Sequence, residues 1–142
     1  MLLFAGGYLI GVWIDSNVPV VLRPAQPLWV AGGAVLAAAG VALFLWGLLT
    51  FARARTGIML QHAATTVVTD GPYRWMRNPM YVGSVMSYIG ASVLINSLWP
   101  LLLLPAVMAL LTEFIIGREE QYMRMMFGPT YDEYCRRVRR WL

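Results

Sequence analysis

The amino-acid sequence predicts an all-α, polytopic membrane protein with about four transmembrane helices and cytoplasmic, amphipathic C-terminal helices. Two observations lead to this fold class. Of the 142 residues, 59% are hydrophobic and only 13% are charged, and the mean hydropathy is +0.61, a composition typical of membrane proteins. The apolar residues also fall in long runs that short polar segments separate. A chain of this length predicts one domain over residues 1–142.

The first two expected spans cover residues 2–22 and 28–51. The apolar run at residues 1–14 measures only about 20 Å as a helix, whereas the hydrocarbon core of a bilayer is about 30 Å thick. We therefore expect the first span to continue to residue 22 and to carry Asp15 and Pro19 near its outer end. The second run has no interruption and is long enough to cross the membrane.

Small residues spaced four apart predict how these two spans associate. They are Gly7 and Gly11 in the first span and Gly33 and Ala37 in the second. Such pairs let two helix backbones approach closely in lipid, where no hydrophobic force drives helices together. We therefore expect the first two spans to form a tight hairpin.

The third and fourth expected spans cover residues 79–96 and 100–117. Asn78 is a favoured residue before the first turn of a helix, and Pro79 suits that turn because its missing N–H costs nothing there. Gly83, Ser87 and Ala91 lie four apart and predict another closely packed face. The short connection between the two spans predicts a second helical hairpin.

The tail, residues 118–142, is expected to form charged helices outside the membrane. Gly128 and Pro129 end a first helix, and Thr130 with Glu133 fits the capping box of a second one. Apolar residues recur at helical spacing from Tyr131 onward. The opposite face holds Arg136, Arg137, Arg139 and Arg140. This pattern predicts an amphipathic helix that lies on an anionic membrane surface.

The positions of the arginines predict the orientation of the chain, because all eleven basic residues are arginines. With four spans, the N-terminus, the loop at residues 53–78 and the tail share one face that holds ten of them. The opposite loop holds only Arg23. The positive-inside rule makes the ten-arginine face cytoplasmic, so both termini and the polar segments are expected there.

The loop and the tail together carry binding groups of several kinds. They are Tyr73, Arg74, Arg77, Asn78 and Tyr81 around the start of the third helix, and Arg118, Glu119 and Glu120 in the tail. The N-terminus of a helix attracts a carboxylate, carboxylates accept hydrogen bonds from hydroxyl or ammonium groups, and aromatic rings face cations or purines. S-adenosylmethionine carries a carboxylate, an amine, a ribose and a sulfonium, and it matches this set.

Two motifs in this order resemble the isoprenylcysteine carboxyl methyltransferase family and its phospholipid methyltransferase relatives. The first is Gly71-Pro-Tyr-Arg-x-x-Arg-Asn-Pro-Met-Tyr-x-Gly83, and the second runs from Glu119-Glu120 through Phe127-Gly128 to Tyr131, Tyr134 and Val138. The resemblance covers roughly residues 65–142. It implies an integral membrane methyltransferase that binds S-adenosylmethionine, and releases S-adenosylhomocysteine, at the cytoplasmic face.

The resemblance also implies roles for particular residues. The expected cofactor-binding residues are Tyr73, Arg77, Asn78, Pro79, Tyr81, Gly83, Glu119 and Glu120. Arginines of the C-terminal segment, with Arg118 and Arg137 as the candidates, would orient the methyl acceptor. Many members of the family have histidine where this chain has Asn78, and asparagine does not titrate, so Asn78 is not a general base. Nothing near the lone Cys135 predicts a metal site.

Methyl transfer is a displacement at an already activated sulfonium, so alignment and charge placement supply most of the catalysis. An arginine-rich site favours a carboxylate acceptor, which needs orientation but no base. Expected partners are membrane lipids and a lipophilic small-molecule acceptor, and no nucleic acid. Three alternatives stay open: a phospholipid or amine N-methyltransferase, an NADPH-dependent sterol-type reductase, which has similar spaced tyrosines, and a non-catalytic membrane subunit.

Overall fold

The computed structural model describes residues 2–20, 22, 27–54 and 67–141. Within these ranges the chain is mostly helical and forms no strand, and the predicted all-α class is confirmed. The helices are α1 (Leu2–Asn17), α2 (Pro27–Arg53), α3 (Pro79–Leu94), α4 (Trp99–Leu111), α5 (Gly117–Phe127) and α6 (Pro129–Arg137), with a 3₁₀ turn η1 (Gly71–Arg74) and a π-helical turn η2 (Thr112–Ile116). Part of the predicted loop, residues 55–66, lies outside the described residues, as does Arg23.

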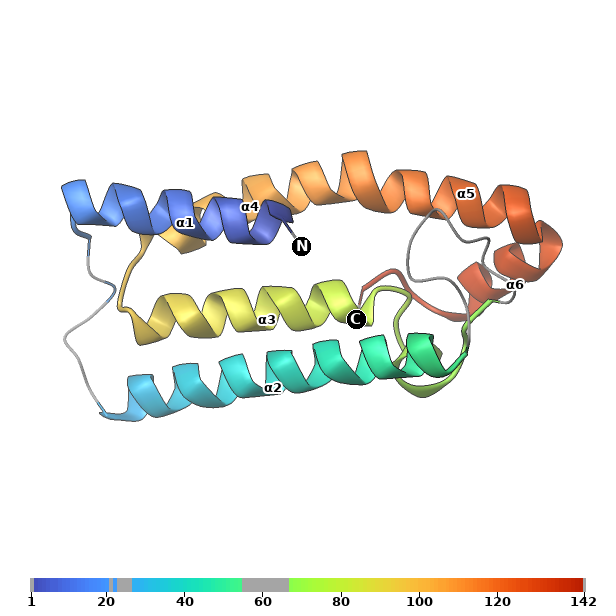
Figure 1. Ribbon diagram of the computed structural model, residues 1–142, viewed down its shortest axis with the longest axis horizontal. Coiled ribbons are helices and arrows are strands. Elements are labelled where there is room, and N and C mark those ends of the chain that lie inside the picture. The colour runs from blue at the N-terminus through green and yellow to red at the C-terminus, as the bar shows by residue number, and fades with distance from the viewer. Residues whose placement is uncertain (1, 21, 23–26, 55–66, 142) are drawn as a thin grey trace.

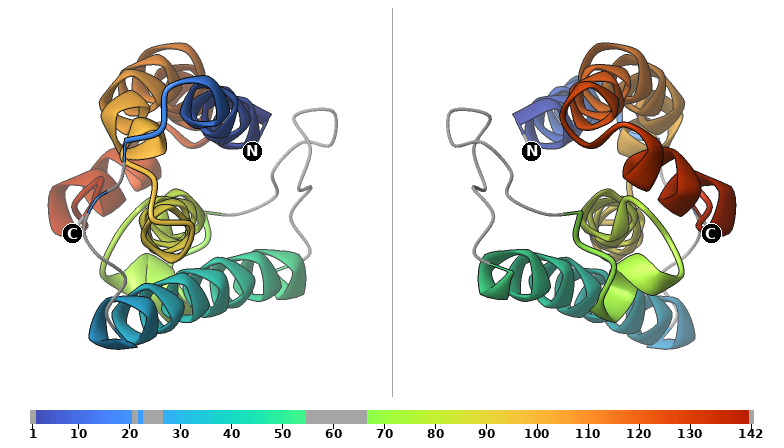
Figure 2. Two further views of the ribbon diagram at one scale, coloured as in Figure 1. Left: turned by 90° about the vertical axis from the view of Figure 1, so that its left-hand side faces the viewer. Right: turned by 90° about the vertical axis from the view of Figure 1, so that its right-hand side faces the viewer.

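The helices lie roughly along one direction in two layers (Figure 1). α1 packs on α4 in one layer, and α2 packs along α3 in the other. Seen from the ends, α3 lies between α2 and the layer of α1 and α4 (Figure 2). The core between the layers contains Phe4, Tyr88, Val107, Leu111 and Ile116. α3 belongs to one layer and also contacts α1 and α4 of the other layer. Segments from both layers can therefore meet at this helix.

Two of the described helical stretches are long and apolar enough to cross a membrane, Pro27–Arg53 and Trp99–Phe127. α1 and α3 have 16 residues each, fewer than the roughly 20 that span a bilayer. The count of four spans therefore stays a prediction. The side chains that face away from the protein are large and apolar, such as Leu28, Val35 and Leu102, which are 84%, 70% and 56% exposed.

The first helix is shorter than predicted and ends at Asn17 rather than at residue 22. Pro19 disfavours the helical conformation of the residue before it and has no N–H to donate. Polar side chains also bond to backbone groups at the end of the helix. Asn17 Nδ2 donates to the carbonyl of Trp13 at 2.8 Å, and Asp15 Oδ1 accepts from the N–H of Val20 at 3.3 Å. These side chains therefore end the helix near Asn17.

The predicted start of the third helix is confirmed, because α3 begins at Pro79 with Asn78 directly before it. The expected cap is wrong in its detail. The Asn78 side chain makes no capping hydrogen bond, and its Nδ2 instead donates to the carbonyl of Arg140 at 3.4 Å. The residue thus joins the helix start to the end of the chain. The helix ends at Leu94, two residues before the predicted end.

The helix that contains the fourth expected span continues beyond residue 117, because one continuous helix runs from Trp99 to Phe127. Gly117 has helical backbone angles, with φ −58° and ψ −41°. The π-helical turn η2 lies directly before it, and such a turn adds a residue and rotates the following side chains around the axis. The charged residues of α5 are therefore a rigid extension of α4. The chain folds back only at Gly128, where φ is +48°.

The glycines pack different helices together from those predicted. Gly7 and Gly11 face Val107 and Pro100 of α4, and Gly33 faces Gly90 and Val93 of α3. The hairpin of the first two spans is therefore wrong, because these surfaces pack on α4 and α3 instead. The predicted packing face of α3 is confirmed, since Gly83 lies against Gly40 and Ser87 Oγ lies 3.4 Å from the carbonyl of Ala37.

We expect Gly40→Ala to destabilise the protein strongly, because a Cβ there would lie 2.5 Å from the carbonyl oxygen of Gly83 and from the backbone nitrogen of Ser87. Both neighbours are backbone atoms, so α2 and α3 would have to move apart, at a cost of about 1–3 kcal/mol. Thermal unfolding in detergent checks this. Gly32→Ala on the same helix is the control, because no atom lies within 4 Å of a Cβ there. Equal melting temperatures for the two variants would contradict the packing.

Candidate functional site

Three segments meet at the start of α3: the turn that contains η1, the helix α5, and residues 138–141, which we call the C-terminal strap. The N–H of Arg77 donates to the carbonyl of Arg139 at 2.9 Å, and Met76 and Arg139 form an isolated parallel bridge. The hydroxyl of Tyr134 donates to the carbonyl of Tyr73 at 2.8 Å. The strap and α6 therefore hold the turn before α3 in place.

A buried ion cluster lies where these segments join. Glu120 is 5% exposed, and its Oε1 lies 3.0 Å from Arg77 Nη1. Arg140 forms a bidentate ion pair with the same carboxylate, with Nε 3.0 Å from Oε1 and Nη2 2.6 Å from Oε2. Arg77 Nη1 also donates to Cys135 Sγ at 2.9 Å. Glu120 is thus fully engaged by two arginines and links α5 to both the turn and the strap.

Glu119 lies in a different setting from Glu120, because successive residues of an α-helix point about 100° apart. Its Oε1 accepts a hydrogen bond from the hydroxyl of Tyr81 at 3.0 Å. Burial, and then the charge of the nearby Glu119, raise the pKa of the Tyr73 hydroxyl above its usual value. The two tyrosines and Glu119 therefore form one polar group at the start of α3, in which the carboxylate can accept further hydrogen bonds.

Two polar atoms of this region are buried without a hydrogen-bond partner in the described part of the chain, the hydroxyl of Tyr73 and Nε of Arg77. Tyr73 is 6% exposed, and its ring contacts Phe51 of α2 with a centroid distance of 6.2 Å. Buried polar atoms are nearly always satisfied in folded proteins. The unpartnered Tyr73 hydroxyl beside Glu119 is therefore the kind of atom that a bound polar ligand would satisfy.

The structure brings most of the predicted site residues together and leaves three of them apart. Those that meet are Tyr73, Arg77, Asn78, Pro79, Tyr81, Glu119 and Glu120. Gly83 packs against Gly40 and Phe44 of α2. Arg118 is exposed on α5, and Arg137 pairs with Glu133 at 3.6 Å on the exposed face of α6.

Sequence reasoning missed Arg140, Tyr134 and Cys135 as parts of this region. Arg140 belongs to a run of arginines that the sequence predicts to face lipid headgroups, and its contact with Glu120 bridges 20 residues. Tyr134 and Cys135 stood on the apolar face of a helix expected to lie on the membrane. The one available signal was the helical spacing of the apolar residues Tyr131, Tyr134 and Val138. This spacing is compatible with packing against protein as well as against lipid.

The last helix also differs from the prediction. Gly128 precedes its first turn in place of Thr130, and it ends at Arg137, so the expected capping box is wrong. Tyr131 and Tyr134 are each 5% exposed and pack with Val138 in a core of their own. The apolar face of α6 is thus covered by the protein rather than by lipid. Its basic side chains Arg136 and Arg137 are exposed.

Buried tyrosines in this region predict a loss of stability at alkaline pH. Burial and nearby charges raise the pKa of Tyr73 and Tyr134, and they raise the pKa of Tyr131 to about 12. Because these folded-state values exceed the unfolded value of about 10, their stabilisation is complete below pH of about 10 and is lost as the pH rises toward the folded pKa. The melting temperature should therefore fall steeply above that pH.

Tyr134→Phe tests this expectation. It removes one titrating hydroxyl and the bond to Tyr73, so we expect a loss of about 1 kcal/mol at neutral pH and a shallower loss at alkaline pH. Thermal unfolding between neutral and alkaline pH measures both. Tyr122→Phe is the control, because Tyr122 is half-buried on α5 and lies outside the tyrosine core. An unchanged alkaline slope in Tyr134→Phe would contradict the assignment.

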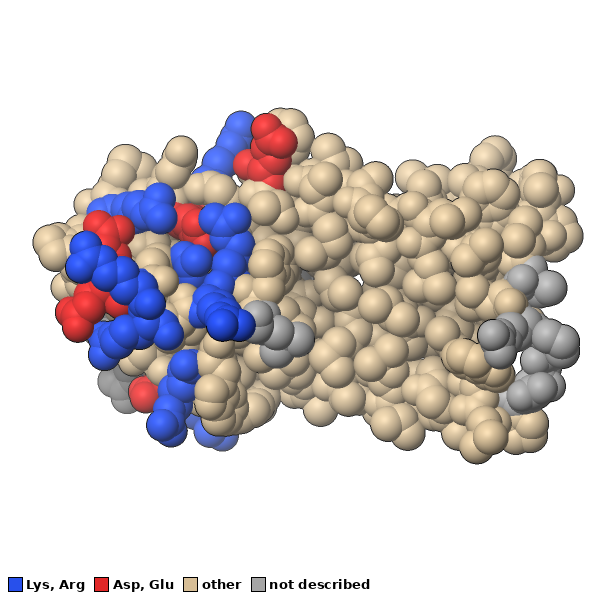
Figure 3. Space-filling model, turned by 180° about the vertical axis from the view of Figure 1, so that it is seen from behind, with Lys and Arg blue, Asp and Glu red and all other residues tan. Residues whose placement is uncertain are grey.

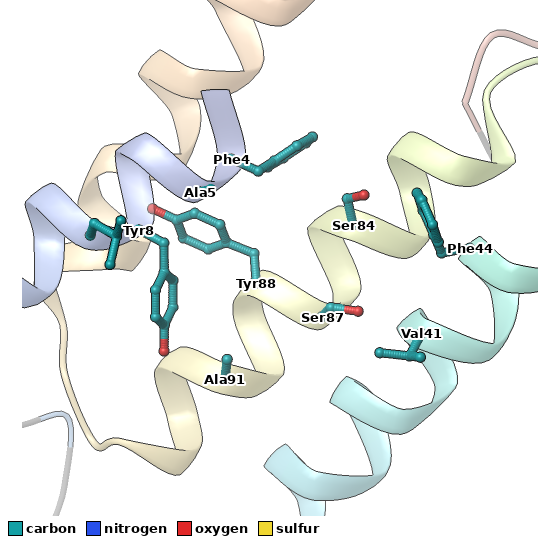
Figure 4. A pocket seen from close by; sticks show the side chains of 10 residues that line it. Phe4, Ala5, Tyr8, Val41, Phe44, Ser84, Ser87, Tyr88 and Ala91 are labelled. Atoms are coloured by element: carbon teal, nitrogen blue, oxygen red, sulfur yellow. The ribbon is translucent and has the colours of Figure 1, made fainter. Parts of the chain in front are cut away.

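An apolar groove of about 500 Å³ lies between α1, α2 and α3, next to this region (Figure 4). It is lined by Phe4, Ala5, Tyr8 and Leu9 of α1, Val41 and Phe44 of α2, and Ser84, Ser87, Tyr88 and Ala91 of α3. Its α3 residues continue the helix that begins with Pro79 and Tyr81. The polar group and the groove therefore share one helix.

The family model for phospholipid methyltransferases matches residues 28–130 of this chain. The chain belongs to the phospholipid methyltransferase family. The match includes α2, the turn before α3, and the helix that carries Glu119 and Glu120. The polar group described above therefore lies inside the matched region.

Individual relatives agree with this membership. The chain is 33% identical over 72 residues to protein-S-isoprenylcysteine O-methyltransferase from Schizosaccharomyces pombe, which covers 51% of this chain and 30% of the relative. It is 33% identical over 73 residues to the cobalt-zinc-cadmium resistance protein CzcN from Cupriavidus metallidurans, covering 51% and 33%, and 31% identical over 75 residues to the nickel-cobalt-cadmium resistance protein NccN from Alcaligenes xylosoxydans, covering 53% and 35%. The chain thus spans about a third of the length of these relatives.

Proposed function

We propose that this member of the phospholipid methyltransferase family transfers a methyl group from S-adenosylmethionine to a lipophilic small molecule at the cytoplasmic face of the membrane. The observation that carries the proposal is the polar group at the start of α3, where Tyr81 donates to Glu119 at 3.0 Å beside the buried, unpartnered hydroxyl of Tyr73. These residues belong to the two motifs on which the resemblance to isoprenylcysteine carboxyl methyltransferases rests.

The residues present fit S-adenosylmethionine. Glu119 would accept hydrogen bonds from an ammonium or ribose hydroxyl group, and the Tyr73 hydroxyl, which has no partner among the described residues, would gain one. The N-terminus of α3 attracts a carboxylate. The bound cofactor would supply a methyl group on a positively charged sulfur. The task of the protein is then to orient the acceptor and exclude water, which matches a buried site built from fixed side chains.

Glu120 has a different task in this proposal. Its carboxylate is enclosed by Arg77 and Arg140, so it does not need a ligand to be satisfied. We propose that the ion cluster fixes the turn and the strap relative to α5, and that Glu119 faces the cofactor. In this proposal Glu120 stabilises the structure of the site, and the neighbouring Glu119 binds the cofactor.

A carboxylate is the favoured acceptor group, because it is deprotonated at neutral pH and needs only orientation by a cation. Arg118 is the better of the two predicted candidates, since it directly precedes Glu119 and is exposed, whereas Arg137 is engaged with Glu133. The family name equally supports an amine of a phospholipid headgroup as the acceptor. The apolar groove beside the site supports a lipophilic acceptor in both cases.

The cytoplasmic location rests on the distribution of charge. The described arginines gather at the end of the molecule that holds η1, α5 and α6, and the rest of the surface in that view is almost free of charge (Figure 3). This is the face that the positive-inside rule assigns to the cytoplasm.

Calorimetric titration of the purified protein in nanodiscs with S-adenosylhomocysteine tests the cofactor. We expect saturable binding that NADPH does not compete away, and competition by NADPH would support a reductase instead. Incubation with S-adenosylmethionine carrying a labelled methyl group and a lipid extract tests the reaction. A labelled lipophilic product is expected, and cofactor binding without any product would support a non-catalytic subunit.

A further inference from the structure

The apolar groove has a wall that consists mainly of carbon. The hydroxyls of Ser84 and Ser87 donate to carbonyls one turn earlier, those of Met80 and Gly83, each at 2.9 Å. They therefore present little polarity to the groove, which is open along one side. In a chain that spans the membrane, such a groove would receive a hydrocarbon chain from the surrounding lipid.

The groove runs along α3 directly away from the polar group. Ser84, Tyr88 and Ala91 follow Tyr81 by three, seven and ten residues, so all four lie on one face of the helix. At a rise of about 1.5 Å per residue, Ala91 lies about 15 Å from Tyr81 along the axis. A chain in the groove would thus have one end beside Tyr81 and Glu119.

Tyr8 stands at the other end of the groove. Its ring packs edge-on against Tyr88 with a centroid distance of 5.1 Å, and it reaches from α1 toward Ala91 of α3 (Figure 4). Phe4 packs against the same Tyr88 ring at 6.3 Å, one turn closer to the start of α1. The Tyr8 ring therefore crosses the gap between α1 and α3 at the end of the groove far from the polar group.

We propose that Tyr8 sets the length of the hydrocarbon chain that the groove accepts from the methyl acceptor. This inference rests on the proposed function, because it takes the reactive end of the acceptor to lie beside Tyr81. The occupant is one hydrocarbon chain that extends about 15 Å from the reactive end. A longer chain has to push the Tyr8 ring aside or bend out of the groove, and both responses weaken its binding.

The experiment uses straight-chain carboxylates of increasing length, each with a photoreactive diazirine at the chain end, added to the full protein in nanodiscs. Labelled residues are located by mass spectrometry, and unlabelled carboxylates of each length compete for the site. In the unchanged protein, the chain that fits should label Tyr8 or Ala91, and longer chains should compete about tenfold less well, the change that about 1.4 kcal/mol of overpacking produces.

Tyr8→Ala should remove this penalty, so that longer chains compete as well as the fitting chain, whereas Tyr8→Trp should shift the preference to shorter chains. Trp13→Ala is the matched control, because it removes an aromatic ring from the same helix at a position that is 68% exposed and outside the groove. The same length preference in all four proteins, or labelling outside the groove, would overturn the inference. Binding of S-adenosylhomocysteine is measured in parallel, so that loss of the proposed function is distinguished from loss of the length preference.

Discussion

Glu120→Ala is expected to destabilise the protein by about 3–5 kcal/mol, because it leaves the charge of Arg77 buried without its partner. The side chains of Arg77 and Glu120 are only 13% and 7% exposed, and the two charges lie 3.0 Å apart. Arg140 loses its partner too, but its side chain is 37% exposed, so water compensates for part of that loss. Thermal and denaturant unfolding in detergent measure the effect.

The control for this prediction is Glu133→Ala, which breaks an exposed pair. Glu133 and Arg137 are 67% and 68% exposed at 3.6 Å, and such surface pairs contribute about 0–1 kcal/mol. A double variant, Glu120→Leu with Arg77→Met, should recover much of the stability, because it removes both buried charges. Equal destabilisation by Glu120→Ala and Glu133→Ala would show that the buried cluster does not hold the segments together.

Glu119→Gln is expected to weaken the binding of S-adenosylhomocysteine about 10- to 150-fold, while the stability changes little. A hydrogen bond to a charged group contributes about 1.5–3 kcal/mol, which corresponds to that range of affinity. Tyr81→Phe should have a smaller effect in the same direction, because it removes only the hydroxyl that holds Glu119 at 3.0 Å. Calorimetric titration compares both variants with the unchanged protein.

The decisive comparison is between the two neighbouring glutamates. Glu119→Gln should lose affinity and keep its melting temperature, whereas Glu120→Ala should lose stability first. Glu133→Gln should change neither property. If Glu119→Gln binds S-adenosylhomocysteine as tightly as the unchanged protein, Glu119 does not face the cofactor, and the proposed division of roles is wrong.

The helical class and several helix boundaries followed from the sequence. The apolar run at residues 28–51 became α2, and Pro79 began α3 as predicted, because proline fixes the backbone angle and lacks the N–H that a helix interior needs. The two motifs also located the polar residues that meet at the start of α3. These are local effects, in which a residue and its near neighbours determine the result.

The choice of helix partners did not follow from the sequence. Gly7, Gly11 and Gly33 correctly indicated close packing, but the faces they mark fit α4 and α3 rather than each other. A small residue indicates that another helix backbone packs closely against it, but it does not indicate which helix this is. Nor did the sequence indicate that one continuous helix runs from Trp99 through Gly117 to Phe127, because glycine permits a turn but also continues a helix when its neighbours hold it there.

The sequence by itself determined which segments are mainly helical, that Pro79 begins α3, and which residues carry charge and aromatic rings. Only the tertiary structure decided that Arg140, and not Arg137, reaches Glu120, and that Glu119 and Glu120 face different neighbours. The physical reason is that a buried ion pair depends on which helices enclose it. That enclosure arises from contacts between residues far apart in the chain, such as the 43 positions between Arg77 and Glu120.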